Sequence, residues 1–328
     1  MRNNSNVRGT EGADGPDAVT VLDQLAPNTW VGNGFNLIAV PCREGTAGCE
    51  LGFNVLVHAT LEVLEFSKVT PALDRGAAEP DVTLNTARYL QTVIDCKDGR
   101  TVLHNEPGLW VHVPPTNQDS LDTFVRLAVT PHGDSILAQG RLLAAISGPP
   151  TIRRISPFPF SVKQGISDIP LIDGDPAKDL TLPENYVRRY LQTPLPPQLI
   201  QAKMSGADMI NDLAALLRAA VENQTIAKTY PIEISTKLDP PFGVERVLKG
   251  HPSVSNLDDV QTAGIRNIPF VNSQADAVLM DAIFWVETMA DTSQKDPHYQ
   301  LQYLQRVILD FQGIHWPHIS GATLKNVA

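Results

Sequence analysis

Residues 88–113 read RYLQTVIDCKDGRTVLHNEPGLWVHV, and this stretch decides the fold class. It contains two extended runs, Arg88–Cys96 and Val102–Val113, with Lys97, Asp98 and Gly99 in the turn region between them. An Asp-Gly pair readily adopts the positive φ values of a tight turn. The stretch therefore predicts a β-hairpin, which places two antiparallel strands side by side.

Similar extended runs occur on both sides of this hairpin. The run at residues 299–311 has two mixed faces, which suits a barrel wall with one face toward a cavity and the other toward solvent or a neighbour. We therefore expect an all-β, predominantly antiparallel, calycin-like barrel of about ten strands. Besides the hairpin, the expected strands are residues 30–40, 53–66, 123–130, 135–146, 227–237, 264–271, 277–289, 299–311 and 320–327.

The strand pattern is interrupted between about residues 180 and 226. Ala207–Val221 is rich in Ala and Leu and carries one apolar stripe at helical spacing, which predicts a helix that packs on the barrel or on a partner. The strands before and after it are alike, so a single domain over residues 19–328 with a helical insertion is simpler than two β domains. Residues 1–18 are polar and aperiodic, and we expect a disordered leader there.

Composition excludes several function classes. The chain has 328 residues and a net charge of −10, from 26 Lys and Arg against 36 Asp and Glu. An acidic surface repels phosphate backbones and anionic membranes, so we expect neither a nucleic-acid partner nor a membrane partner. The 26 prolines disfavour a helical bundle, because each removes a backbone donor.

Cysteine usage and the N-terminus bear on the compartment. Cys42, Cys49 and Cys96 are an odd number with no Cys-x-x-Cys spacing, which fits neither a disulfide scaffold nor a zinc ribbon. Cys42 and Cys49 could close the small Gly-rich loop between them, but a reducing compartment favours free thiols. With no apolar segment typical of a signal peptide, we expect a cytoplasmic protein.

His104 and Glu106 are the main candidates for chemistry. The sequence contains no phosphate-binding loop, no nucleophile elbow and no zincin motif. Spacing of two along a strand puts His104, Glu106 and Trp110 on one face, and Pro107-Gly108 favours a break that aims side chains toward a lumen. His104 could hydrogen-bond a ligand or act as an acid or base, or it could be a structural histidine. Glu106, if buried, would need a donor such as Arg88 or Arg126.

Two other segments contain candidate binding residues. Trp30, followed by Val31-Gly32-Asn33-Gly34, could plug one end of a barrel or be an ordinary buried aromatic beside a bulge. Near the C-terminus, His315 and His318 flank Trp316-Pro317. Proline restricts the residue before it to extended geometry, so we expect His315 in a turn and His318 at the start of the last strand. A histidine held in this way can ligate haem iron.

These segments resemble a known family. The Trp30–Gly34 opening, the strand meander and the last strand entered through His318 resemble nitrobindin-like haem-binding β-barrels of the calycin group. The segments His104–Trp110 and Trp316–His318 also resemble longer, uncharacterised bacterial and fungal barrel proteins. The resemblance implies haem b with its iron bound by His318. We expect His315, Trp316, Trp110 and Trp30 to be further cofactor-binding residues.

Three functions follow as alternatives. The first is a barrel that binds an apolar ligand, with haem b as the sharpest candidate. The second is a metal-free carrier of a fatty acid or an isoprenoid, its lumen closed by the helical insertion. The third is an isomerase, dehydratase or peroxidase that uses His104 and Glu106 as catalytic groups. The expected partners are an apolar small molecule and a second copy in a homodimer.

Overall fold

The computed structural model describes residues 18–43, 45, 49–74, 81–114, 122–131, 133–161, 184–201, 204–236, 268, 279–290 and 298–327. The expected leader lies outside the described residues apart from Ala18. The expected strand at 264–271 lies outside them apart from Ile268.

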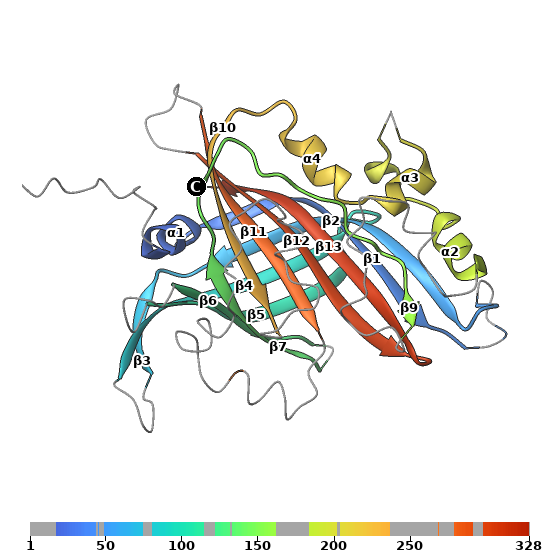
Figure 1. Cartoon of the computed structure of the whole chain (residues 1–328), viewed down its shortest axis with the longest axis horizontal. Coiled ribbons are helices and arrows are strands. Elements are labelled where there is room, and N and C mark those ends of the chain that lie inside the picture. Colours follow the sequence, from blue (N-terminus) through green and yellow to red (C-terminus); the bar gives the residue numbers. More distant parts are fainter. Residues whose placement is uncertain are drawn as a thin grey trace, which may run out of the picture.

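Ten of the described strands close into an antiparallel barrel (Figure 1). Pairing of the first strand with the last, from Thr29 opposite Val327 to Leu37 opposite Ile319, closes the sheet. The expected all-β barrel of about ten strands is confirmed. In order around the barrel the strands are β1 (Thr29–Pro41), β2 (Phe53–Phe66), β4 (Val82–Asp95), β5 (Val102–Val113), β6 (Thr123–Val129), β7 (Ser135–Leu142), β10 (Ile226–Ser235), β11 (Met280–Met289), β12 (Tyr299–Phe311) and β13 (Ile314–Val327).

Three short strands attach to this barrel. β3 (Thr70–Asp74) pairs with β4, β8 (Ile146–Ser147) pairs with β10, and β9 (Phe160–Ser161) pairs with β13. The strand expected over residues 135–146 is therefore divided, since β7 ends at Leu142 and pairing resumes only at β8.

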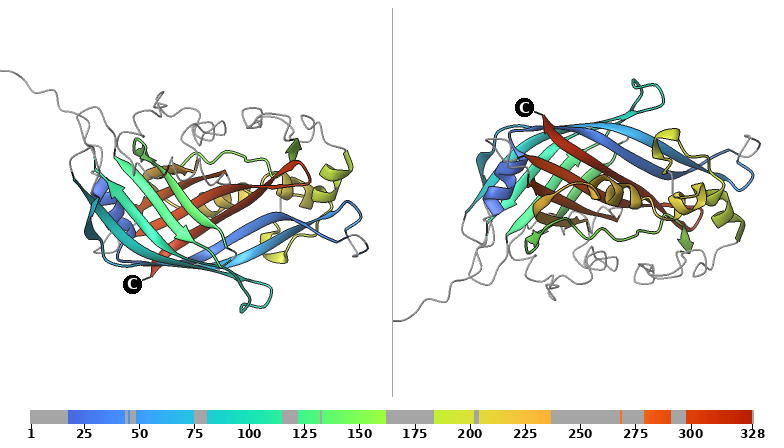
Figure 2. Two further views of the ribbon diagram at one scale, coloured as in Figure 1. Left: turned by 90° about the horizontal axis from the view of Figure 1, so that it is seen from below. Right: turned by 90° about the horizontal axis from the view of Figure 1, so that it is seen from above.

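One end of the barrel is covered by α1 (Ala18–Leu25), which the sequence analysis did not predict (Figure 2). Leu22 and Leu25 of this helix are buried in the same cluster as Trp30 and other inward side chains of the barrel. The Trp30 indole Nε1 donates to the Leu25 carbonyl oxygen at 3.0 Å. The helix and Trp30 together seal this end, so the plug expected of the tryptophan is shared with a helix.

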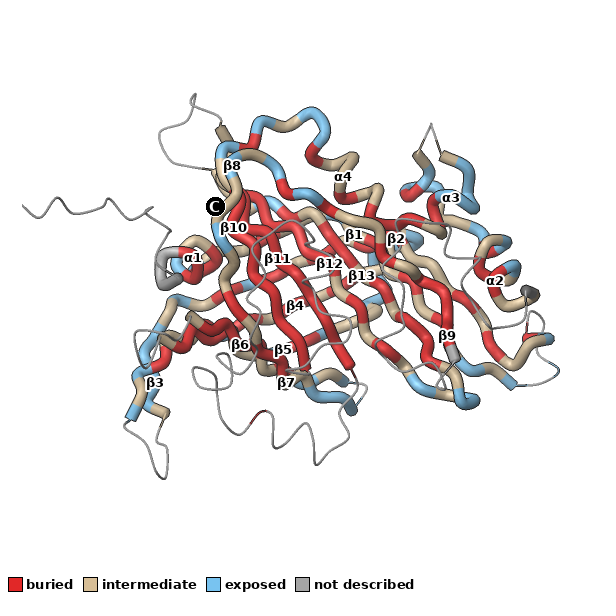
Figure 3. The backbone as a smooth tube through the Cα atoms, in the orientation of Figure 1, coloured by how far each residue is buried: buried red, intermediate tan, exposed pale blue. Residues whose placement is uncertain are grey.

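Helices between residues 184 and 221 cover part of the outer face of the barrel (Figures 1 and 3). A second core cluster, which includes Leu37, Leu213, Leu217 and Trp285, forms where they meet the strands. Within the described residues no helix is long and apolar enough to span a membrane. The helical elements are α2 (Glu184–Leu191), the 3-10 turn η3 (Pro197–Leu199), α3 (Gly206–Asn211) and α4 (Ala215–Val221).

The single helix expected over residues 207–221 is two helices. Ser205 caps α3 through a reciprocal hydrogen-bond pair with Asp208, and α3 ends at Asn211, because the φ of −150° at the next residue, Asp212, is not helical. The Asp212 carboxylate forms an ion pair with Arg218 of α4. The apolar stripe continues through the break, so periodicity alone did not reveal it.

The last strand begins earlier than expected. β13 starts at Ile314, directly after a turn at Gly313 with φ 68°, so His315, Pro317 and His318 all lie within the strand. Pro317 is paired with Ile308 on β12, whereas the pairing of β13 with β1 stops at Ile319. Proline is tolerated there because one side of the strand has no β1 neighbour that needs its N–H.

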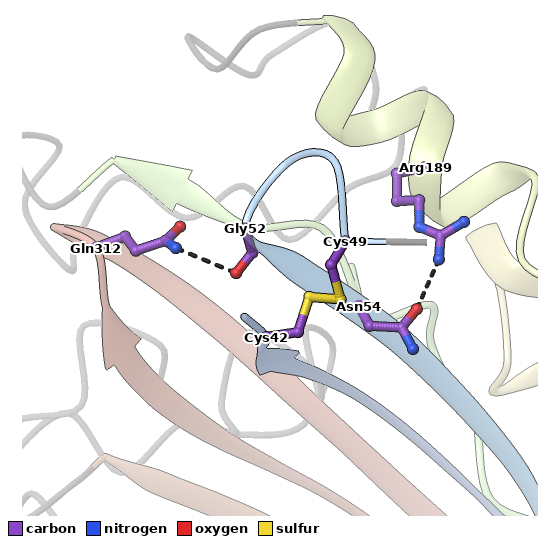
Figure 4. The surroundings of a disulfide bond; sticks show 6 residues. All are labelled: Cys42, Cys49, Gly52, Asn54, Arg189 and Gln312. Carbon is purple, nitrogen blue, oxygen red and sulfur yellow. Dashed lines mark hydrogen bonds between the residues drawn. A yellow bond between two sulfur atoms is a disulfide. The ribbon is translucent and has the colours of Figure 1, made fainter. Parts of the chain in front are cut away.

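The β1–β2 connection contains a disulfide between Cys42 and Cys49, which corrects the expectation of free thiols (Figure 4). The hairpin places the two Cα atoms 5.9 Å apart, within the range that a disulfide spans. The expectation rested on a reducing compartment, and the local hairpin geometry overrides it. Hydrogen bonds anchor β2 beside this loop, from Arg189 to Asn54 at 2.6 Å and from Gln312 to Gly52 at 3.2 Å.

Candidate functional site

A layer of buried polar side chains crosses the middle of the barrel. Each strand alternates its side chains between lumen and exterior, and the layer occupies inward positions on five different strands. Inward neighbours on the same strands, such as Leu64 on β2 and Trp110 on β5, belong to the apolar core. We call this set the polar layer: Glu62 on β2, Gln91 on β4, Glu106 on β5, Arg126 on β6 and Tyr303 on β12.

An ion pair between Glu106 and Arg126 forms one half of the layer. The Arg126 guanidinium donates to Glu106 Oε1 at 2.6 Å from one terminal nitrogen and at 3.0 Å from Nε. The Tyr89 hydroxyl also donates to Glu106 Oε1 and accepts from Arg126 Nε at 2.9 Å. Burial alone would raise the pKa of Glu106, but the Arg126 charge and hydrogen bonds from His104 and Tyr89 hold that pKa at about 2. Glu106 is therefore a carboxylate at neutral pH.

Glu62 forms the other half without a cation. Its Oε2 accepts from the Tyr303 hydroxyl at 2.7 Å and from Gln91 Nε2 at 3.1 Å, and its Oε1 accepts from the Thr60 hydroxyl at 3.0 Å. Burial raises the pKa of Glu62 above its usual value, although these hydrogen bonds offset part of the effect. The two carboxyl groups of one layer thus have opposite pKa shifts, because only Glu106 has an arginine beside it.

Gln91 joins the two halves. Its amide nitrogen donates to Glu62, and its oxygen accepts from Arg126 at 3.2 Å. Arg126 also donates to Gln305 of β12 at 2.8 Å, across the lumen from its own strand. The layer is one connected network, and such networks fix side chains in place when their members are satisfied.

His104 connects this network to the surface. Its Nε2 lies 2.9 Å from Glu106 Oε2, and its side chain is 28% exposed whereas that of Glu106 is 1% exposed. The sequence spacing placed both residues on one face of a strand, and the structure has them in contact there. Arg126, one of the two donors considered for Glu106, makes the ion pair; Arg88 pairs in register with Leu109 on the outward-facing side.

The layer separates two halves of the lumen. Toward α1, rings fill the space: Trp110 meets Phe284 edge-on at 4.8 Å between ring centroids, and Phe284 stacks on Tyr303 at 5.5 Å. The other half lies toward the β4–β5 turn, and we call it the open half because several of its inward residues, such as His104, are half-buried and not fully buried. Strand register places Asn36 opposite His58 there, on the same faces as Gly34 and Thr60.

The candidate cofactor-binding residues do not form one site. Trp30 and Trp110 lie in the lumen core, on the α1 side of the polar layer. Trp316 lies in the second core cluster, where it stacks on Phe311 at 4.6 Å. His315 bonds to Asp310 and contacts the Phe160 ring at 4.9 Å. His318 alternates with Ala322 onto the inward face of β13, and three strands separate β13 from β5, which carries His104.

A groove lies outside the barrel, between α4 and the wall formed by β1 and β13. Its volume is about 460 Å³. No histidine lines it, and no group of three or more His, Cys, Asp or Glu that could hold a metal ion occurs among the described residues. The described helices of the insertion pack on the barrel, as expected, and cover a cavity on its outer wall, whereas the carrier alternative placed the insertion over the lumen.

Glu62, Gln91 and Tyr303 are not among the site residues predicted from the sequence. Each is a polar residue on an inward strand face whose neighbours toward α1 belong to the core cluster of the lumen. In residues 60–66, TLEVLEF, the inward positions are Thr60, Glu62, Leu64 and Phe66. A polar residue among the inward side chains of a strand is the only sign of a buried polar site that the sequence offers. The register of the barrel strands is needed to show that the five polar positions meet.

Comparisons with known proteins add little. No known family and no curated protein matches the chain. One solved structure, a conserved hypothetical protein from Mycobacterium tuberculosis described as essential for bacterial survival during infection and as having a double hotdog fold, is 12% identical. The alignment covers 94% of this chain and 78% of that one with a TM-score of 0.14, which is too low to carry an argument. The barrel agrees with the fold that the nitrobindin resemblance implies, and no match supports membership of that family.

Proposed function

We propose that the open half of the barrel lumen binds a neutral, largely apolar small molecule without a metal, and that His104 contacts its polar group. The observation that carries the proposal is the position of His104. Its imidazole is partly exposed, and it is held by a carboxylate that is almost completely buried. A side chain in this position can meet a ligand that enters from solvent while the buried network keeps it oriented.

Unsatisfied polar atoms in the open half support an occupant. Asn36 Oδ1 and His58 Nδ1 are buried and have no hydrogen-bond partner in the described part of the chain. Buried polar atoms are nearly always hydrogen-bonded, to protein, water or ligand. Val93 and Val307 face the lumen in this half and form part of its apolar wall. A ligand with an apolar body and a single hydrogen-bonding group suits this lining.

The charges of the polar layer favour a neutral ligand. Arg126 is already paired with Glu106, and burial favours the neutral form of Glu62. An anionic ligand would need a cation that is not already committed, because an unpaired buried charge is costly. An isoprenoid-like molecule therefore suits the lumen better than a fatty acid does.

The geometry supports binding more directly than turnover. Glu106 is ionised at neutral pH and accepts hydrogen bonds at both oxygens, so it is a poor general acid. Its place in the network is that of a positioning residue, which orients the His104 ring. An isomerase or dehydratase would have to rely on His104 alone for proton transfer.

Haem fits the described residues less well than a small neutral ligand does. The inward register of His318 is compatible with an axial ligand. However, the α1 half of the lumen is filled with rings, Arg126 is not available for the haem propionates, and no histidine lines the groove outside. The described residues therefore do not fit haem.

Titration with Nile red, a neutral apolar dye, tests the proposal. The dye should bind to the parent protein with a rise in fluorescence. Val93→Trp, which fills the lumen beside His104, should abolish binding, whereas Thr92→Trp, on the outward side of the same strand, should leave it unchanged. His104→Ala removes the polar contact and should weaken binding by a few-fold.

Two results would overturn the proposal. One is unchanged dye binding in both Val93→Trp and His104→Ala; if Val93→Trp does not fold by circular dichroism, His104→Ala decides alone. The other is a Soret shift on adding haemin that disappears in His318→Ala, which would favour a haem protein.

A further inference from the structure

The groove under α4 has a lining unlike that of the lumen. β1 and β13 form one wall, and η3 and α4 form the other. Apolar side chains, among them Phe35, Leu199 and Leu216, make up about half of the lining. At about 460 Å³ the groove lies within the range of small-molecule sites, roughly 300 to 1,000 Å³.

One charged residue, Lys325, lines the groove. No Asp or Glu is among the lining residues. Lys325 is exposed and has no ion-pair partner in the portion of the chain that the structure describes. The groove is thus locally cationic in a chain whose net charge is −10.

Two neutral glutamine side chains lie at or next to the groove. Gln224 lines the groove, and its Oε1 is buried without a partner among the described residues. Since the oxygen and nitrogen of such an amide are interchangeable by rotation, this end of Gln224 can also donate. Gln302, fully buried, donates to the Leu217 carbonyl at 3.0 Å and to Thr323 Oγ1 at 2.7 Å, which fixes α4 to β13 at the groove.

We propose that this groove is a second binding site, which takes a fatty monocarboxylate with its carboxylate at Lys325 and its chain along the apolar walls. A single lysine matches a single negative charge. The neutral amide of Gln224 supplies a further hydrogen bond to the carboxylate. The proposal does not depend on the lumen site, because it rests on other residues on the opposite face of the wall.

Dodecanoate, with 1-dodecanol as its neutral counterpart, is the probe that we suggest for calorimetric titration. Dodecanoate should bind more tightly than the alcohol. Lys325→Gln should lower the affinity for dodecanoate about fivefold, which is near the upper end of what an exposed ion pair contributes. The affinity for the alcohol should not change. Lys97→Gln, an exposed lysine in the β4–β5 turn, is the matched control and should change neither.

A blocking pair tests the location. Ala220→Trp fills the groove and should abolish dodecanoate binding, whereas Ala219→Trp, one residue away and not part of the lining, should preserve it. Both variants should still bind Nile red in the lumen, so loss of this site is distinguishable from loss of the other.

Three results would overturn the proposal. No dodecanoate binding to the parent protein excludes the site, and binding that persists in Ala220→Trp places the ligand elsewhere. Equal affinity for dodecanoate and 1-dodecanol, together with no effect of Lys325→Gln, would show that Lys325 does not bind a carboxylate. If Ala220→Trp does not fold, the Lys325→Gln comparison still decides the ligand class.

Discussion

Replacing Arg126 by methionine should strongly destabilise the barrel at neutral pH. The substitution leaves the Glu106 carboxylate buried, with a 1% exposed side chain and no cation beside it. Removing one partner of a buried ion pair costs about 3–5 kcal/mol. The pKa of Glu106 indicates a free energy of similar size, since its fall from 4.5 to about 2 corresponds to about 3.5 kcal/mol at roughly 1.4 kcal/mol per pKa unit.

The pH dependence of this loss has a definite sign. In the parent protein the lowered pKa of Glu106 contributes stability that is present above pH 4.5 and is lost as the pH falls toward 2. Without Arg126, burial raises the pKa of Glu106, so the carboxyl group becomes neutral on acidification at little cost. The destabilisation caused by Arg126→Met should therefore be large at pH 7 and smaller at pH 4.

Urea unfolding followed by tryptophan fluorescence measures both effects. The double variant Glu106→Gln with Arg126→Met removes both charges and should recover most of the lost stability, while Glu106→Gln alone should not, because it leaves the arginine unpaired. A loss below about 1 kcal/mol in Arg126→Met, or a double variant no more stable than that single variant, would refute the reasoning.

Two other substitutions test the packing and charge of the wall. Gly34→Ala should lower the urea midpoint by an amount equivalent to about 1–3 kcal/mol of unfolding free energy. The added Cβ would lie 2.7 Å from Glu62 Oε1 and 2.5 Å from a backbone oxygen of β13. An unchanged midpoint would contradict this close packing. Burial raises the pKa of Glu287 to about 8, so parent stability should fall as pH rises from 4.5 to 8. Glu287→Gln should flatten that fall and unfold at a higher temperature than the parent at pH 8, as calorimetry can check.

Local patterns predicted much of the barrel. The Lys97–Gly99 turn and the alternation of side chains along the chain predicted β5 and β12, and both strands begin and end at the predicted residues. The contact between His104 and Glu106 also followed from local sequence, because residues two apart on a strand share a face.

Non-local features could not be predicted in this way. The meeting of Glu62 with Tyr303 depends on the register of strands 241 residues apart in sequence. The helix α1 has eight residues and follows a polar segment, so its apolar face gave too little periodic signal. The Cys42–Cys49 disulfide was missed because an argument about compartment outweighed the hairpin that brings the two residues together.

A crystal structure of the protein grown with Nile red tests the central claim most directly. The account predicts electron density for the dye in the open half of the lumen, against His104 and on the side of the polar layer away from α1. Density only in the groove under α4, or a lumen filled by protein side chains with no dye, would contradict it.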